Sequence, residues 1–359
     1  MPTIRDLADL GQSVWLDYIK RSFIDSGELS ALIAEGVAGV TANPTILEKA
    51  IAESSDYDRD IARLAREGKT DTEIYEALAR DDIGRAADLL RPVWDRTHGG
   101  DGYVSLEVSP DLARDTSGTV EAAKHLFAML SRPNVYIKVP ATKEGYPAIR
   151  QLIAEGINVN ITLMFSLSQY EAVAEAYLSG LETRLEAGQE ISLVTSVASF
   201  FVSRVDTLVD KELARIGNAE LQGKIAIANA KRVYGRFREL FQGPRWGKLA
   251  ACGAHLQRPL WASTSTKNPA YPDTLYVDEL IGPDTVNTIP PATLTAFKDH
   301  GRVRNALAEG MDEVNRQLGQ LDELGVDLEE IGNRLTDEGI GLFAKSFDEL
   351  MSGIAAKRG

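Results

Sequence analysis

The chain has 359 residues, of which 44% are hydrophobic, and its 53 acidic side chains outnumber 39 basic ones to give a net charge of −14. This hydrophobic fraction supports a sizeable buried core and excludes an intrinsically disordered chain. The acidic balance repels nucleic acid and anionic membrane surfaces, so neither is an expected partner, and an anionic substrate would need a local cluster of basic side chains.

The cysteine content and the first residues indicate a cytoplasmic protein. The single Cys252 cannot form an intrachain disulfide, and the start MPTIRDLADLGQ lacks the charged, apolar and small-residue order of a secretory signal. The apolar stretches are shorter than the ~20 residues of a membrane helix. The four histidines have no paired spacing, so we expect no metal site, and no cofactor motif is present.

Short β-branched runs alternate with longer helical patterns along the whole chain, which is typical of βα units around a parallel sheet. The expected strands cover residues 13–19, 36–44, 102–108, 134–140, 157–165, 192–200, 259–265 and 284–290. Eight such strands favour a closed barrel over an open sheet. We therefore predict an α/β fold, a (β/α)8 TIM barrel, formed by residues 1–359 as a single domain.

Two stretches exceed the simple βα repeat. Amphipathic patterns predict a helical insertion over about 54–99, after the second strand. Residues from about 305 to 356 read as terminal helices interrupted by GVDLEEIG, which we expect to pack beside the barrel mouth.

Polar side chains recur at the same place in several strands. Because residues two apart in a strand share a face, Asn158, Asn160 and Thr162 form one polar row in a strand that should otherwise be aliphatic. Further candidates stand alone in or just after the other early strands, namely Asp17, Asn43, Glu107 and Lys138. Barrel enzymes gather catalytic residues from separate strands at the carboxyl ends, so these side chains are expected to meet there.

A lysine among these residues indicates a specific chemistry. Burial disfavours a charged amine, which makes the free amine of Lys138 available to attack a ketone. The resulting iminium withdraws electrons, so a neighbouring carbon–carbon bond can break without a metal. Asp17 and Glu107 can supply the general acid and base. The structural alternative is a buried ion pair between Lys138 and one of these carboxylates, and for the amides a network that only fixes strand register.

The motifs VTANPTI, SLEVSP, VYIKVPAT, INVNITLMFS and SFFVSR resemble those of transaldolases, in the same order along a barrel. The resemblance runs from about Val14 to about Pro290. It implies that Lys138 forms the Schiff base, that Glu107 and Thr162 hold the water that relays protons, and that Asp17 takes the proton from the hydroxyl beside the breaking bond.

The same resemblance implies how substrate is bound. Asn43, Asn160 and Ser199 would hold the dihydroxyacetone unit, and Arg204, Ser265 and Lys267 would bind the phosphate. Lys267 stands where many members of the family carry arginine. Its ammonium group would bind phosphate as a point charge, without the two parallel hydrogen bonds that a guanidinium group can donate. Phe200 follows Ser199 where proline is common, which should alter the loop and not the chemistry.

The leading hypothesis is therefore a transferase of ketone residues that moves dihydroxyacetone between phosphorylated sugars, as a monomer or homodimer. A second is an aldolase that releases free dihydroxyacetone. Smaller relatives that release free dihydroxyacetone carry glutamine and tyrosine near two key places. This chain has Glu107 and Phe201 there, and both residues favour the transferase. A third is a catalytically idle barrel that binds sugar phosphate, against which the intact Lys138, Glu107 and Asp17 argue.

Overall fold

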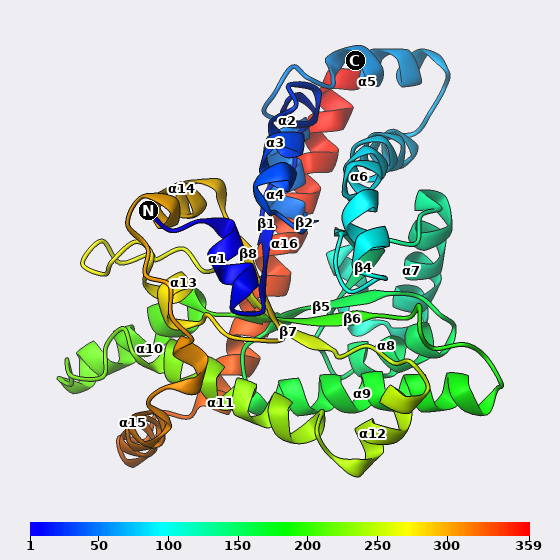
Figure 1. Cartoon of the computed structure of the whole chain (residues 1–359). Helices are drawn as coiled ribbons and strands as arrows, with labels where there is room; N and C mark the ends of the chain where they lie inside the picture. The colour runs from blue at the N-terminus through cyan, green and yellow to red at the C-terminus, as the bar shows by residue number, and fades with distance from the viewer.

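The computed structural model describes all residues from 1 to 359, and its centre is a closed barrel of parallel strands (Figure 1). Each strand pairs with its neighbours in chain order, and β1 closes the ring by pairing with β8. The strands are β1 Gln12–Leu16, β2 Gly39–Thr41, β3 Tyr103–Glu107, β4 Val135–Pro140, β5 Val159–Met164, β6 Ser196–Phe201, β7 Arg258–Ala262 and β8 Thr285–Ile289. The predicted (β/α)8 barrel is confirmed.

Most of the strands are shorter than the sequence patterns indicated, and the difference matters most at the seventh. Its predicted range of 259–265 is too long, because β7 ends at Ala262 and Ser263 adopts a left-handed backbone with φ of 57°. Ser265 and Lys267 therefore lie in the loop that follows β7, not in the strand itself.

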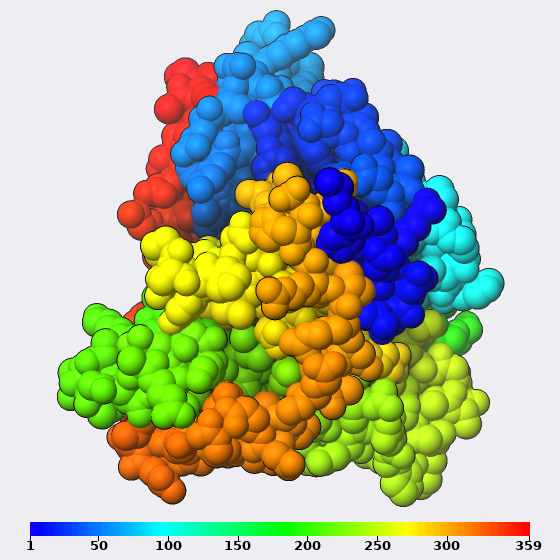
Figure 2. Space-filling view, turned by 60° about the vertical axis from the view of Figure 1, so that its left-hand side comes forward, coloured from blue at the N-terminus to red at the C-terminus, as the bar shows by residue number.

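Helices surround the barrel and connect its strands. They are α1 Ile4–Asp9, α2 Arg21–Asp25, α3 Glu28–Glu35, α4 Pro44–Ile51, α5 Asp58–Arg66, α6 Asp71–Arg96, α7 Thr116–Leu130, α8 Gly145–Ala154, α9 Leu167–Glu186, α10 Ser203–Ile216, α11 Ile225–Leu240, α12 Pro244–Ala251, α13 Leu275–Glu279, α14 Pro291–His300, α15 Met311–Glu323 and α16 Leu328–Arg358, with short 3-10 turns η1 Pro110–Arg114 and η2 Ala306–Ala308. The space-filling view shows the N-terminal segment against the segment around β8 (Figure 2), where the Asp284 amide donates to the Gly11 carbonyl at 3.0 Å.

An aromatic stack fills the part of the barrel interior below the carboxyl ends of the strands. The ring of Tyr136 lies 4.3 Å from that of Tyr103 and 5.9 Å from that of Trp15, measured between centroids. Gly39 permits this packing, since a β-carbon there would fall 2.4 Å from the Trp15 ring. The stack gives the strand ends above it a rigid floor.

The predicted insertion over 54–99 contains helices α5 and α6. It is fastened to α2 by the buried side chain of Arg21, which forms ion pairs with Asp82 at 2.9 Å and with Asp81 at 3.1 Å. The main hydrophobic core extends from Ile4 to Ile354 and includes residues of α5, α6 and the terminal helices.

The terminal helix α16 crosses the barrel mouth over 31 residues and ends beside α5 (Figure 1). Small residues recur every seventh position on its inner side, at Gly332, Gly339, Ser346 and Gly353. A β-carbon at each glycine would lie only 2.5–2.8 Å from a side-chain atom of Ser166, Leu163 or Ala52, and the Ser346 hydroxyl hydrogen-bonds that of Thr45 at 2.9 Å. This stripe lets a helix of the chain terminus approach the mouth closely.

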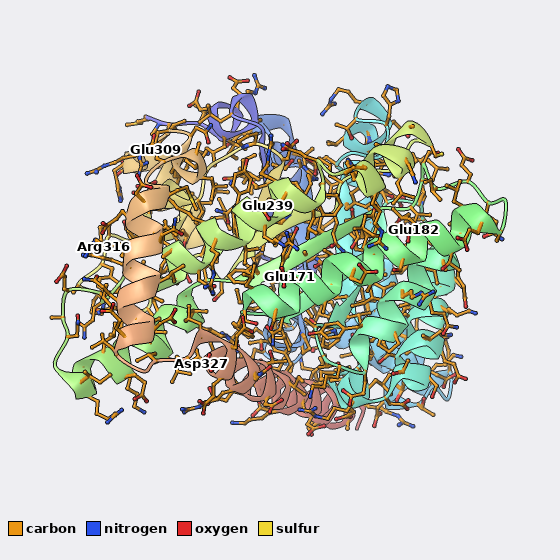
Figure 3. All side chains as sticks on the ribbon, turned by 90° about the horizontal axis from the view of Figure 1, so that it is seen from below. Glu171, Glu182, Glu239, Glu309, Arg316 and Asp327 are labelled. Atoms are coloured by element: carbon orange, nitrogen blue, oxygen red, sulfur yellow. The ribbon has the colours of Figure 1, made fainter.

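Charged side chains cover the outer helices. Seen from below, Glu171, Glu182, Glu239 and Arg316 project from α9, α11 and α15 (Figure 3). None of the helices combines the length and apolar character needed to cross a membrane.

Candidate active site

The site is centred on Lys138, whose side chain points into the barrel from β4. Glu107 stands beside it in register on β3, and the lysine Nζ lies 3.1 Å from the glutamate Oε2. Nζ also donates to the Ala42 carbonyl at 3.1 Å. Both side chains are about 95% buried. Such a pair is costly to bury, because neither charge retains its hydration.

Glu107 has unused hydrogen-bonding capacity. Its Oε2 lies within ion-pair distance of Lys138 and accepts no hydrogen bond from any other group of the protein. Burial raises the pKa of Glu107, and the charge of Lys138 opposes this rise. The fully buried hydroxyl of Thr162 on β5 also has no partner within the protein. Buried polar atoms without partners are rare, and at this place both can serve a substrate or a water molecule.

Asp17 follows directly after β1 and faces the same cavity. Its Oδ1 accepts a hydrogen bond from the Thr41 hydroxyl at 2.7 Å, and Thr41 is linked in turn to Thr288 at 2.6 Å. Burial raises the pKa of Asp17, while the Thr41 hydrogen bond and the charges of Lys138 and Lys267 oppose the rise. A raised pKa makes the protonated form of the carboxyl group more accessible, which favours a role in general acid–base catalysis.

The three predicted dihydroxyacetone ligands lie at two depths. Ser199 on β6 lines the cavity and donates to Asn160 Oδ1 at 2.6 Å, while Asn160 lies below and donates to Ser105 at 3.0 Å. Asn43 caps α4 by accepting from the Ile46 amide at 2.9 Å, which leaves its side-chain nitrogen without a protein partner. Asn158, the first residue of the predicted polar row, belongs to a network near the aromatic stack, where it contacts Thr195.

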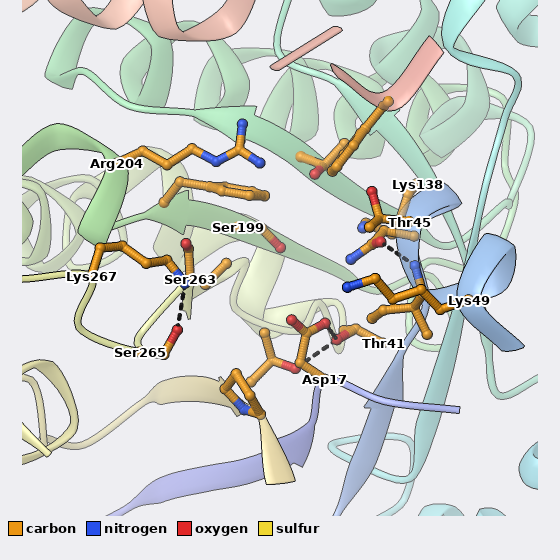
Figure 4. Close-up of a pocket in the computed structure, with 18 residues that line it drawn as sticks. Asp17, Thr41, Thr45, Lys49, Lys138, Ser199, Arg204, Ser263, Ser265 and Lys267 are labelled. Carbon is orange, nitrogen blue, oxygen red and sulfur yellow. Dashed lines mark hydrogen bonds between the residues drawn. The ribbon is translucent and has the colours of Figure 1, made fainter. Parts of the chain in front are cut away.

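Two cations lie at the other side of the cavity (Figure 4). Arg204, near the start of α10, has no carboxylate or hydrogen-bond partner and sits 5.9 Å from the Phe201 ring and 6.0 Å from the Phe343 ring. Lys267 donates to the Ser265 hydroxyl at 2.8 Å. Burial lowers the pKa of Arg204. Lys267 is more exposed, and partial desolvation at the cavity together with the neighbouring charge of Arg204 lowers its pKa. Two cations that line one cavity without carboxylate partners favour the binding of an anion between them.

The cavity has a volume of about 330 Å³. Its lining includes eight of the ten predicted site residues, and the other two, Glu107 and Asn160, are buried behind the lining. Sequence reasoning missed Thr41, which shares a strand face with Asn43, and also Lys49 of α4 and Phe343 of α16. Thr41 could have been found from the alternation of its strand, whereas nothing local indicates that Phe343 reaches the site.

A closed (β/α)8 barrel with a buried lysine–carboxylate pair at the carboxyl ends of its strands, below two unpaired cations, defines a barrel enzyme built for an anionic substrate. The family model described as transaldolase/fructose-6-phosphate aldolase matches residues 14–354. The chain belongs to this family.

The chain is also similar to curated relatives over almost its entire length. The chain is 49% identical to the transaldolase of Thermobifida fusca, with 98% of this chain and 97% of that protein covered. It is 48% identical to the transaldolase of Thiobacillus denitrificans, covering 99% and 100%, and 45% identical to transaldolase 2 of a Nostoc species, covering 98% and 96%.

Proposed function

We propose that this enzyme is a transaldolase of the non-oxidative pentose phosphate pathway. It transfers a dihydroxyacetone unit from sedoheptulose 7-phosphate to glyceraldehyde 3-phosphate, giving erythrose 4-phosphate and fructose 6-phosphate. Full-length relatives at 45–49% identity are named transaldolase. The single observation that carries the proposal within the structure is the buried contact of Lys138 with Glu107 at the floor of a cationic cavity.

The reaction begins at Lys138. Its amine attacks the ketone carbon C2 of the donor, and loss of water gives an iminium. Glu107 and Thr162, whose oxygens have hydrogen-bonding capacity to spare, hold the water that carries protons in this step. Their burial keeps that water from exchanging freely with solvent.

Asp17 acts in the second step. It removes the proton from the C4 hydroxyl, the C3–C4 bond breaks, and the electron pair moves into the iminium to form an enamine on Lys138. The first aldose leaves, C3 of the enamine attacks the aldehyde of the acceptor, and Asp17 returns its proton to the new hydroxyl. Hydrolysis of the iminium then restores the lysine.

Binding groups flank this centre. Asn43 and Ser199 hold the hydroxyls of the three-carbon unit from the cavity lining, and Asn160, whose Oδ1 accepts from Ser199, completes this set from behind the lining. Arg204, Ser265 and Lys267 hold the phosphate of the departing and arriving aldose. These cations lie in a protein of net charge −14, so they provide the local attraction that an anionic substrate needs.

The alternative is an aldolase that releases free dihydroxyacetone, since the family description includes fructose-6-phosphate aldolase. Phe201 lines the cavity with a ring that has no hydroxyl to donate a proton to the enamine. Glu107 beside Lys138 is a carboxylate and not an amide. Both features support transfer, and a rate of free dihydroxyacetone release equal to the rate of transfer would overturn this choice.

The remaining properties follow from the same proposal. We expect a cytoplasmic enzyme that uses no cofactor or metal, binds neither nucleic acid nor membrane, and exists as a monomer or homodimer. Phosphorylated sugars are its partners.

Borohydride trapping tests the function directly. The enzyme is incubated with fructose 6-phosphate and reduced, and its peptides are mapped by mass. A reduced three-carbon adduct on the peptide with Lys138 is expected. Absence of that adduct, or sugar-phosphate binding without turnover, would overturn the proposal in favour of an idle barrel.

A further inference from the structure

Two elements supply the proposed phosphate ligands, helix α10 with Arg204 and the loop of residues 263–274, called the phosphate loop below, with Ser265 and Lys267. In Figure 2 the phosphate loop, in yellow, lies directly on α10, in green. At its beginning it is joined to the first residue of α10. The Ser203 amide donates to the Ser263 carbonyl at 3.1 Å, and the two hydroxyls are 2.9 Å apart.

The far end of the phosphate loop is joined to the same helix. The Tyr271 hydroxyl donates to Asp210 Oδ2 at 2.6 Å, and the other oxygen of Asp210 accepts from the Gly223 amide at 2.9 Å. The Tyr271 ring lies flat against Gly223, where a β-carbon would fall 2.8 Å from the ring. The glycine, at φ of 70°, thus allows the ring to approach Asp210.

A second tyrosine continues this attachment just after the loop. The buried Tyr276 hydroxyl donates to Asp206 Oδ2 at 2.8 Å, and Asp206 Oδ1 accepts from the Ala226 amide at 2.7 Å. Arg204, Asp206 and Asp210 all belong to α10. One helix therefore carries the proposed phosphate-binding arginine, the carboxylate that holds the end of the loop and the carboxylate that holds the helix after it.

The tip of the loop has little other support. Residues 267–270 are exposed, and the only protein partner of the Lys267 amine is Ser265 in the same loop. The distance between Lys267 and Arg204 is consequently set by the two attached ends. Of these, the beginning is held by β7, whereas Tyr271 is the first side chain after the tip that hydrogen-bonds to α10.

We propose that the hydrogen bond from Tyr271 to Asp210 is a positioning contact that holds the phosphate loop at the spacing from Arg204 required by a substrate phosphate. The inference rests on the proposed function, because it concerns the phosphate of the transferred sugars. Tyr271 acts through Ser265 and Lys267 and does not itself line the cavity.

The test compares Tyr271→Phe with Tyr234→Phe, each of which removes one hydroxyl. Tyr234 lies on α11, and its hydroxyl donates to the Pro283 carbonyl at 3.2 Å. For each protein we would measure KM for erythrose 4-phosphate and for unphosphorylated glyceraldehyde as acceptors at saturating donor, and the Kd of inorganic phosphate by calorimetry.

Tyr271 acts on the phosphate only through the loop, so we expect the loss of its hydroxyl to count as one hydrogen bond of ordinary net strength. Tyr271→Phe should then raise KM for erythrose 4-phosphate and the Kd of phosphate about 3- to 10-fold. The kcat value and the kinetics with glyceraldehyde should stay within about twofold of wild type, as should all values of Tyr234→Phe. Asp210→Ala, which removes both acceptor oxygens, should reproduce the effect, and the double variant should add little to either single change.

Unchanged phosphate affinity in Tyr271→Phe would overturn the inference, and so would an equal loss with both acceptors, which indicates a general structural defect. Failure of the proposed function has a different signature, because wild-type protein would then show no transfer to any acceptor while phosphate affinity could still be compared among the variants.

Discussion

Replacing Lys138 by methionine should remove activity and make stability depend on pH in a defined way. Methionine keeps most of the apolar stem of the lysine but leaves the buried carboxylate of Glu107 without its cation, which lies 3.1 Å away in the wild type. The pKa of Glu107 is already raised by burial and is held down by Lys138, so it should rise further in the variant.

The magnitude follows from the unfolded pKa of Glu107, which is near 4.5. A carboxyl group that must be neutral when folded costs about 1.36 kcal/mol for each pH unit above that value, or at most about 3.4 kcal/mol at pH 7 and about 0.7 kcal/mol at pH 5. Between pH 5 and pH 7 the folded variant therefore binds more protons than the unfolded chain. The stability of Lys138→Met relative to wild type should therefore fall as pH rises.

Urea unfolding at pH 5, 6 and 7 measures this difference, and the Lys138→Met/Glu107→Gln double variant is the control. The double variant lacks the carboxyl that lies against Lys138 and keeps only Asp17, whose pKa the Lys138 charge also lowers, so its difference from wild type should change less with pH than that of Lys138→Met. A difference for Lys138→Met that is constant from pH 5 to 7 would refute the reasoning on the buried pair. Retained transfer activity in this variant would refute the assignment of Lys138.

Three further outcomes follow from the structure. Asp17→Asn should still form the Schiff base but lose at least ~100-fold in turnover, so borohydride should trap the intact six-carbon ketose phosphate; a three-carbon adduct at the wild-type level would contradict this. Phe343→Ala removes one ring beside Arg204 and should raise KM for phosphorylated acceptors about 2- to 30-fold. Phe347→Ala, one turn further along α16, is the matched control. An equal rise of KM in both variants would argue against a role for the contact between Phe343 and Arg204. Burial raises the pKa of Asp206 from 3.8 to about 7, so between pH 3.8 and pH 7 the folded protein binds one proton more than the unfolded chain. The stability of the wild type should therefore fall by up to about 4 kcal/mol as pH rises through this range. Asp206→Asn should remove this loss in urea unfolding at pH 5 and 7.5, and parallel pH curves for the two proteins would contradict the prediction.

The strands and the centre of the site could be predicted because their signals are local. Alternation in a strand fixes which side chains share a face, and parallel strands bring their carboxyl ends together. Lys138, Glu107 and Asn160 therefore had to meet once the barrel was recognised. That residues 1–359 form one domain stays a prediction, as do the chemical roles of the individual side chains.

Sequence patterns failed where the backbone leaves regular geometry. The seventh strand was extended to Ser265 because its polar and β-branched residues continue past Ala262, but the left-handed conformation of Ser263 ends the strand earlier. The two tyrosines that hold the phosphate loop were also missed. Their partners on α10 are about 60 to 70 residues away in the chain, and no periodicity connects them.

The placement of α16 had a signal in the sequence that a search for apolar periodicity does not detect. Small residues at 332, 339, 346 and 353 form a single stripe, and each of the three glycines lies where a larger side chain would collide with the barrel mouth or α4. Phe343 comes one helical turn after Gly339, and the close approach at that glycine brings its ring to the guanidinium of Arg204. Arg204 is thus held between two aromatic rings and not by a carboxylate, which leaves all its donors free. A carboxylate partner would have fixed the arginine equally well, but it would have competed for the same donors with the phosphate that we propose Arg204 binds.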